Sequence, residues 1–348
     1  MNYIEFNGNK IPVSDLSTYK PQTQNEDYIV SFVSGWINQK LEFQFHTSGS
    51  TGEPKPILLK RRQLQSSAEA TIKSLNLISH STCLLCINPK FIGGSMMLVR
   101  ALLNNMNIIF KEPSSNPLVD INESIEFAAF VPLQVSHLIE NEFDKFNSIK
   151  KIIIGGGAIN PQLESKLTSC TNSIYSTYGM TETSSHIALK KLKSDNSYFE
   201  VLPNISISLD NRGCLVINGE VTDNQDIVTN DLVDIIEQDK FVWLGRIDNI
   251  INSGGIKINA EKLEAKIFSL FNTESINRGF FITGVENEKF GQMICLVIEG
   301  SEEIQNIESL LRSQLDKYEV PKEIIYRNEF VLTPTGKINK EATLKKHG

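Results

Sequence analysis

Short apolar runs alternate with longer segments of helical periodicity along the first half of the chain, and this alternation limits the possible folds more than any other feature. The runs typical of strands span residues 82–88, 106–110, 127–131 and 151–154. The segments typical of helices span residues 61–77, 94–104, 133–142 and 161–167, the last with Asn160 as its N-cap and Pro161 in its first turn. Because alternating strands and helices form a mostly parallel sheet covered by helices, the sequence predicts an α/β fold.

The spacing of the predicted elements shortens after residue 199, which indicates a small β-rich part. Its predicted strands span residues 205–209, 214–217, 233–236 and 241–244. From Asp248 onward a compact α+β pattern follows, with helices over 260–271 and 304–317 and strands near 279–283 and 295–298. We therefore predict a large domain over residues 1–247 and a small one over residues 248–348.

Composition and charge exclude several classes of protein. The 348 residues have a formal net charge of -7 and no strongly basic run, which argues against a nucleic-acid surface. The first residues lack the basic start and apolar core of a secretory signal. The most apolar stretch, residues 83–103, contains Lys90 and Arg100, so we expect no membrane span and a cytoplasmic protein. The C-x-x-C pair of Cys83 and Cys86 is typical of a buried strand here, and the odd count of five cysteines indicates no disulfide framework.

A run of small, hydroxylic and glycine residues precedes the first predicted α/β helix. It comprises Thr47, Ser48, Gly49, Ser50, Thr51, Gly52, Glu53, Pro54 and Lys55. Glycines let backbone N–H groups converge on an anion, hydroxyls add donors, and Lys55 adds a positive charge. The spacing is not that of a Walker A loop. Taken alone, the run fits a polyphosphate-binding loop and a flexible Ser/Gly turn equally well.

Two further segments follow predicted strands. The first comprises Gly155, Gly156, Gly157 and Ala158. It opens at the carboxyl end of a strand, where open α/β sheets bind nucleotides, although a tight strand-to-helix turn is the simpler explanation of this segment alone. The second comprises Tyr178, Gly179, Met180, Thr181, Glu182 and Thr183. A carboxylate beside a triphosphate suits Mg²⁺, so Glu182 is a candidate metal ligand; an ordinary surface or capping acid is the alternative.

The fourth segment runs from Asp231 to Ile258, and the fifth comprises Pro334–Lys337. Asp231 is a candidate acceptor for ribose hydroxyls, and Arg246 and Asp248 follow the predicted hairpin. The turn Ser253, Gly254 and Gly255 is also explained as a glycine-rich linker. Lys337 lies on a Pro/Gly turn near the C-terminus, where a lysine is ordinarily a solvated surface charge.

Together the five segments, in this order from about residue 45 to residue 340, resemble the adenylate-forming superfamily of acyl-CoA synthetases, adenylation domains and luciferases. Within it the chain looks most like the o-succinylbenzoate–CoA ligases of menaquinone synthesis, through the segment from Tyr178 to Ile187 and the helix around Arg100. The resemblance implies a large domain with a β-rich subdomain and a mobile C-terminal domain. Only about forty residues precede the phosphate loop here, including a helix expected over 27–39, so the early part of the fold is shortened.

The resemblance implies ATP and coenzyme A as substrates and Mg²⁺ as a cofactor, and it assigns roles to the matching residues. Lys337, Thr181, Glu182 and Arg246 are the expected catalytic residues, with Glu182 as the Mg²⁺ ligand. The expected ATP contacts are Thr47–Gly52, Lys55, Gly155–Ala158, Tyr178, Gly179, Thr181, Asp231 and Arg246. Asp248 is the expected hinge, and the turn of Ser253, Gly254 and Gly255 the expected path of the CoA thiol.

The acyl substrate is less constrained. Lys90, Arg100 and His186 are candidates to bind a second carboxylate, as o-succinylbenzoate requires. Each has a structural alternative, with Arg100 a helix-surface charge and His186 a pocket-wall or core hydrogen-bonding group. Another aryl- or acyl-CoA ligase is the nearest alternative function. An amino-acid adenylation domain and a non-catalytic ATP- or acyl-binding protein of the same fold are more distant alternatives. The sequence does not determine the oligomeric state.

Overall fold

The computed structural model describes residues 3–46, 55–193, 197–288, 291–333 and 338–345. The chain forms two compact units. The first comprises residues 1–208, 216–227 and 235–241, and the second comprises residues 209–215, 228–234 and 242–348. The architecture is α/β, as predicted, whereas the domain boundary at Asp248 stays a prediction.

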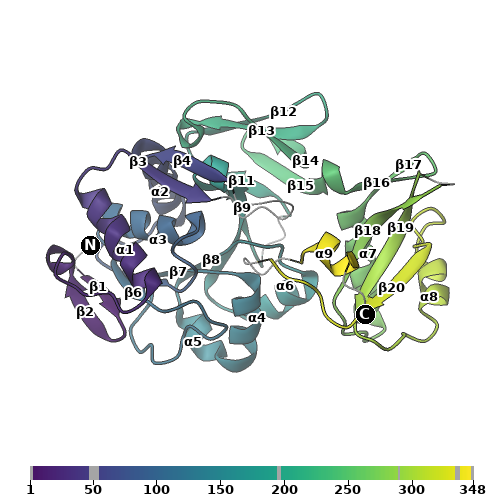
Figure 1. Ribbon diagram of the computed structural model, residues 1–348, viewed down its shortest axis with the longest axis horizontal. Helices are drawn as coiled ribbons and strands as arrows, with labels where there is room; N and C mark the ends of the chain where they lie inside the picture. The colour runs from purple at the N-terminus through teal and green to yellow at the C-terminus, as the bar shows by residue number, and fades with distance from the viewer. Residues whose placement is uncertain (1–2, 47–54, 194–196, 289–290, 334–337, 346–348) are drawn as a thin grey trace. The chain divides into compact units, whose positions relative to one another are not determined.

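A large mixed sheet runs through the first unit (Figure 1). Its parallel part has the strand order β1-β6-β5-β7-β8-β9, with antiparallel β2 beyond β1 and antiparallel β10 and β11 beyond β9. The strands are β1 (Tyr3–Phe6), β2 (Asn9–Pro12), β5 (Thr82–Leu85), β6 (Asn107–Phe110), β7 (Phe127–Phe130), β8 (Lys151–Ile154), β9 (Ser173–Met180), β10 (Ser185–Lys191) and β11 (Phe199–Val201). The strands β6 and β7 are buried along their whole length, which explains their continuous apolar sequences.

Helices pack on both faces of this sheet, because successive side chains of a strand point to opposite faces. Cys83 and Leu85 belong to the core that contains α1, α2 and α3, while Leu84 and Cys86 belong to the core that contains α4, α5 and α6. The helices are α1 (Gln24–Ile37), α2 (Arg61–Leu75), α3 (Ile92–Leu103), α4 (Pro132–Asn141), α5 (Phe143–Ser148) and α6 (Pro161–Leu167). None of the helices in the described ranges has the length and apolar character needed to cross a bilayer.

A separate antiparallel hairpin consists of β3 (Glu42–His46) and β4 (Pro56–Lys60). The β-rich part that the sequence predicts consists of β12 (Ile205–Leu209), β13 (Cys214–Gly219), β14 (Ile227–Glu237) and β15 (Lys240–Arg246). Short 3₁₀ turns are η1 (Val13–Asp15), η2 (Thr181–Thr183), η3 (Glu220–Thr222) and η4 (Ile247–Asn249). Within the first unit, β15 pairs with β11 through Lys240 and Phe241.

The second unit has a smaller sheet with the order β17-β16-β19-β18, and β20 pairs parallel to β19. Its elements are β16 (Ile250–Ser253), β17 (Ile256–Asn259), α7 (Ala260–Thr273), β18 (Phe280–Asn287), β19 (Gly291–Glu299), α8 (Ile307–Gln314), β20 (Glu323–Arg327) and α9 (Lys340–Lys345). One face of the sheet packs on α7 and α8. The other face packs Phe281, Cys295 and Val297 against Leu344 of α9.

The element types agree with the sequence predictions, and the ends differ for local reasons. The strand predicted over 82–88 ends at Leu85, because Asn88 turns the chain and its Oδ1 accepts from the backbone N–H of Lys90 at 2.9 Å. The helix predicted over 304–317 is shorter, since Asn306 has a left-handed φ of 59° and the helix starts only at Ile307. Asn160 caps α6 as predicted, with its side chain accepting from the N–H of Leu163.

Candidate active site

Polar side chains from three elements meet inside the first unit, in a group that we call the polar chamber. It consists of Ser67 and Thr71 from α2, Arg100 from α3, and Ser185 and His186 from β10. All five residues are buried. Nη2 of Arg100 donates to Oγ of Ser185 at 3.3 Å, and Nε2 of His186 lies 3.0 Å from Oγ1 of Thr71.

The guanidinium of Arg100 is the unusual member of the polar chamber. The residue is only 1% exposed, and no described carboxylate forms an ion pair with it. Its Nε has no hydrogen-bond partner among the described residues, and neither has Oγ of Ser67. Burial lowers the pKa of Arg100 to about 9, so the side chain is still cationic at neutral pH. A buried charge without an opposite charge costs several kcal/mol, and an anionic ligand at this place would compensate it.

His186 is neutral and has a defined tautomer. Oγ1 of Thr71 donates its proton to the backbone oxygen of Ser67 at 3.0 Å. Nε2 of His186 must therefore donate to Oγ1 of Thr71, which leaves Nδ1 as an acceptor. Burial, and secondly the positive charge of Arg100, hold the pKa of His186 well below its usual range.

The backbone that presents Ser185 is strained. Ser184 has a φ of 59° and Ser185 a φ of 132°, a conformation that a residue with a side chain rarely adopts. The strand β9 approaches so closely that a Cβ on Gly179 would lie 2.2 Å from the backbone oxygen of Ser185. Gly179 is thus required by strand packing, and the strained turn aims Ser185 at Arg100.

The segment from Tyr178 to Glu182 comprises the last three residues of β9 and the start of η2. The ring of Tyr178 packs edge-on against Phe241, with centroids 5.2 Å apart. Thr181 is buried and Glu182 half-buried in η2, and neither side chain has a hydrogen-bond partner among the described residues. Among the described residues, no group of three or more acidic, histidine or cysteine residues is arranged so that it could hold a metal ion. Glu182 is a half-buried carboxylate, the ligand type that Mg²⁺ takes besides phosphate oxygens, and its role as a Mg²⁺ ligand stays a prediction.

The glycine turn after β8 lies beside this segment, because β8 and β9 are parallel neighbours. A Cβ on Gly155 would meet Oγ1 of Thr177 at 2.5 Å, and Gly156 has a φ of 80°. Both positions therefore need glycine for structural reasons. Gly156, Gly157 and Ala158 are exposed at this edge of the sheet.

Lys90 is exposed, and its ammonium donates to Oε1 of Gln24 on α1 at 3.1 Å. Of the three residues that the sequence suggests for a second carboxylate, the structure thus brings together Arg100 and His186. The helix-surface alternative for Arg100 is wrong, because α3 buries this residue completely. Lys55 lies exposed just before β4. The predicted residues Thr47–Gly52 and Lys337 lie outside the described residues.

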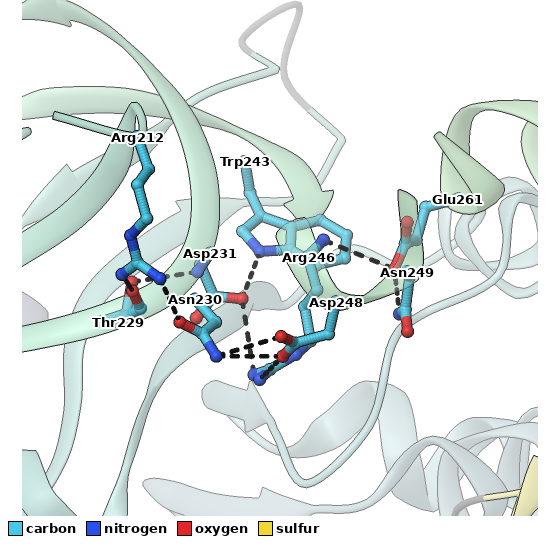
Figure 2. A network of polar contacts seen from close by, with 9 residues as sticks. All are labelled: Arg212, Thr229, Asn230, Asp231, Trp243, Arg246, Asp248, Asn249 and Glu261. Atoms are coloured by element: carbon cyan, nitrogen blue, oxygen red, sulfur yellow. Dashed lines mark hydrogen bonds and ion pairs between the residues drawn. The ribbon is translucent and has the colours of Figure 1, made fainter. Parts of the chain in front are cut away.

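In the second unit, Asp231, Arg246 and Asp248 belong to an ion-pair network (Figure 2). Oδ1 of the buried Asp231 accepts from Nε1 of Trp243 at 3.0 Å and lies 4.0 Å from Nη1 of Arg246. Nη2 of Arg246 donates to Asp248 at 2.6 Å, and the amide of Asn230 also donates to Asp248. The hydrogen bond from Arg246 is the main reason why the pKa of Asp248 lies below its usual value.

The turn between β16 and β17 consists of Gly254 and Gly255, with φ values of 59° and 83°. Two residues with positive φ form the type I′ turn of a tight hairpin, which explains both glycines without a ligand. Their expected role beside the CoA thiol therefore stays a prediction.

Sequence reasoning did not single out Ser67, Thr71, Asn230 or Trp243. Ser67 and Thr71 are spaced four residues apart on α2, beside the buried Leu64 and Ala68. Two hydroxyl residues at this spacing on an apolar face were an available signal of a polar site. Nothing in the sequence pairs Trp243 with Asp231, since that contact depends on the register of β14 and β15.

The comparisons with known proteins agree with this geometry. A family model described as AMP-binding enzyme matches residues 37–221. The chain belongs to the AMP-binding enzyme family. A solved structure, described as an acyl-CoA synthetase (AMP-forming)/AMP-acid ligase II-like protein from Dyadobacter fermentans, is 38% identical, with a TM-score of 0.64 over 95% of this chain and 97% of that one. The predicted resemblance to adenylate-forming enzymes and the predicted fold class are confirmed.

More distant relatives point within the family. The 2-succinylbenzoate–CoA ligase of Staphylococcus epidermidis is 22% identical over an alignment of 320 residues that covers 85% of this chain and 68% of the relative. The o-succinylbenzoate CoA synthetase of Bacillus subtilis, solved in complex with its acyl-adenylate intermediate, has a TM-score of 0.75 at 19% identity, over 88% of this chain and 69% of that one. Several 2-succinylbenzoate–CoA ligases are therefore among the proteins that this AMP-binding enzyme resembles.

Proposed function

We propose that this chain is an AMP-forming acid–thiol ligase that converts o-succinylbenzoate to its CoA thioester in menaquinone synthesis. In the first half-reaction a substrate carboxylate oxygen attacks the α-phosphorus of ATP, and pyrophosphate leaves. In the second, the CoA thiol attacks the acyl carbon and AMP leaves. The membership of the AMP-binding enzyme family and the similarity to 2-succinylbenzoate–CoA ligases support this reaction.

The polar chamber is the observation that favours a dicarboxylic acid. A monocarboxylic acid uses its one carboxylate at the α-phosphate and leaves Arg100 buried without a counter-charge. A second carboxylate could accept from Nε of Arg100, which has no hydrogen-bond partner among the described residues. Charge-assisted hydrogen bonds of this kind are about twice as strong as neutral ones. The neutral His186 can orient such a group without adding a second positive charge.

The roles of the other residues follow the family pattern and are part of the proposal. Thr181 would donate to the α-phosphate, and Glu182 would hold Mg²⁺, which offsets the negative charge of the phosphates. Gly155–Ala158 and Tyr178 would frame the adenine, and Asp231 with Arg246 the ribose. Thr47–Gly52 and Lys55 would bind the β- and γ-phosphates. Lys337 would bridge the carboxylate and the α-phosphate, where a compact charge can follow the charge from attacking to leaving oxygen.

The thiol must reach the site that Lys337 would occupy in the first half-reaction, so the proposal includes rotation of the C-terminal domain about Asp248 between half-reactions. Lys337→Ala should abolish adenylate formation and largely spare thioester formation from supplied acyl-adenylate. Equal loss of both half-reactions would contradict this role of Lys337.

Pyrophosphate release with ATP and Mg²⁺ tests the proposed function, with o-succinylbenzoate compared against benzoate, a fatty acid and an amino-acid mixture. Mass spectrometry then identifies the CoA thioester. Selective turnover of o-succinylbenzoate is the expected result. Turnover of another acid alone would keep the chemistry and replace the substrate, and ATP binding without pyrophosphate release under every acid would favour a non-catalytic binding protein.

A further inference from the structure

Asp231, the residue proposed to bind the ribose, is almost fully buried. The residue lies on β14 and is only 6% exposed. Its backbone N–H donates to Oγ1 of Thr229 at 3.0 Å, and Thr229 is buried as well. A buried carboxylate has lost most of its water and needs protein donors in return. Thr229 holds the backbone at Asp231, so the orientation of the carboxylate depends on groups that contact its oxygens.

Two side chains direct a nitrogen toward Oδ1 of Asp231 (Figure 2). Nε1 of Trp243 donates to this oxygen at 3.0 Å, whereas Nη1 of Arg246 lies 4.0 Å away, which is too far for a hydrogen bond. Nη2 of Arg246 is instead bonded to Asp248 at 2.6 Å. Of these two neighbours, Trp243 is therefore the one that fixes the position of Oδ1.

The indole of Trp243 is well suited to hold a carboxylate without neutralising it. Trp243 is half-buried on β15, the neighbour of β14 in the sheet. Its Nε1–H is a neutral group that only donates, and a rigid ring with two side-chain torsions carries it. The carboxylate of Asp231 thus keeps its negative charge, which makes it a strong acceptor for further donors. Phenylalanine at position 243 would retain a ring and remove the donor.

We propose that Trp243 is a positioning residue for the nucleotide. By holding Oδ1 of Asp231, it orients the carboxylate so that this group accepts hydrogen bonds from the ribose hydroxyls of ATP. The inference rests on one part of the proposed function, the assignment of Asp231 to the ribose. An acceptor that is already oriented binds more tightly, because less side-chain freedom is lost when the ligand arrives. Trp243 therefore affects the affinity for the nucleotide and not for the acid.

Pyrophosphate release with two nucleotides tests the proposal. Trp243→Phe should raise the KM for ATP roughly tenfold, as expected when a hydrogen bond to a charged group is lost, and should leave kcat and the KM for the acid unchanged. With 2′,3′-dideoxy-ATP, which lacks both ribose hydroxyls, variant and wild type should have equal KM values. Tyr326→Phe is the matched control and should change neither KM, because it removes a hydroxyl that accepts from the N–H of Ile304 at 3.0 Å elsewhere in the same unit.

Calorimetric binding of AMP and 2′,3′-dideoxy-AMP provides a readout that needs no turnover. Trp243→Phe should bind AMP roughly tenfold more weakly than the wild type and dideoxy-AMP equally well, a result that supports the proposal even if no acid is converted to a thioester. Equal weakening with both nucleotides would assign Trp243 to the fold alone. Unchanged AMP binding by the variant, no preference of the wild type for AMP over dideoxy-AMP, or no AMP binding at all would also overturn the proposal. Selective turnover of o-succinylbenzoate alongside any of these results would keep the proposed function.

Discussion

Two arginines in the two units have opposite surroundings. Arg100 is fully buried in the polar chamber, has no acid partner among the described residues, and leaves its Nε without a hydrogen bond. Arg246 is exposed at 45% of its side chain and lies among two carboxylates, Asp231 and Asp248 (Figure 2). The first arrangement costs folding free energy, and the second costs almost none.

The two arginines differ in how easily each can change its contacts. A buried cation without a partner is held in place by packing and gains its counter-charge only when a ligand arrives. An exposed ion pair can break and form again at little cost, because water replaces each lost contact. This difference supports the two proposals, that the polar chamber recognises the substrate and that Asp248 is a hinge.

Replacement of the buried arginine should have the largest effect. Arg100→Met removes the charge at similar volume. The variant can no longer form the buried charge pair with the ligand carboxylate, so kcat/KM for o-succinylbenzoate should fall roughly 100-fold. The rate of pyrophosphate release at several acid concentrations measures kcat/KM. The same acid without its ring carboxylate, 4-oxo-4-phenylbutyrate, is the control and should be used equally by variant and wild type. An equal loss with both acids would assign Arg100 to the fold alone.

The hinge is tested by a backbone restraint. Asp248→Pro fixes φ near the value that η4 already requires, so the fold should tolerate it while rotation at this residue is restricted. Overall thioester turnover should fall and adenylate formation should persist, measured separately by mass spectrometry and pyrophosphate release. Unchanged overall turnover would count against a hinge at Asp248, and Asp248→Asn separates the backbone restraint from loss of the carboxylate.

The two regions should also differ in pH dependence. The pKa of His186 is lowered in the folded state, so below about pH 6.5 the unfolded chain binds a proton that the folded chain does not. Stability should therefore fall as the pH drops below about 6.5, with a slope that approaches a limit of about 1.4 kcal/mol per pH unit. The lowered pKa of Asp248 has no effect there, because its contribution is lost only as the pH falls below the pKa of an unfolded aspartate. Denaturant unfolding of wild type and His186→Gln measures the slope, and equal slopes would contradict a buried neutral imidazole.

The smallest effect belongs to the exposed network. Arg246→Met should change the free energy of unfolding by less than about 1 kcal/mol, and high salt should remove most of that change. Arg100→Met, by contrast, should leave the protein as stable as the wild type or more stable. Urea unfolding at low and high salt compares the two variants. A large, salt-independent destabilisation by Arg246→Met would show that the network supports the fold.

The sequence predicted the regular elements well, because the apolar runs and helical periods have a direct physical reading. The burial pattern of β7 and the cap of α6 followed from local residues. The polar chamber could be predicted only in part. Arg100 and His186 were candidates, but their meeting depends on α3 packing against the strained turn at Ser185. Glycines at positions 155 and 179 had a packing reason that only the distance between neighbouring strands reveals.

The most direct test of the central claim is a crystal structure with o-succinylbenzoate or its acyl-adenylate bound. The account predicts that one carboxylate of the ligand lies about 2.7–2.9 Å from Nε of Arg100, the range of a charge-assisted hydrogen bond. A ligand carboxylate bound elsewhere, with Nε of Arg100 still without a partner, would contradict it.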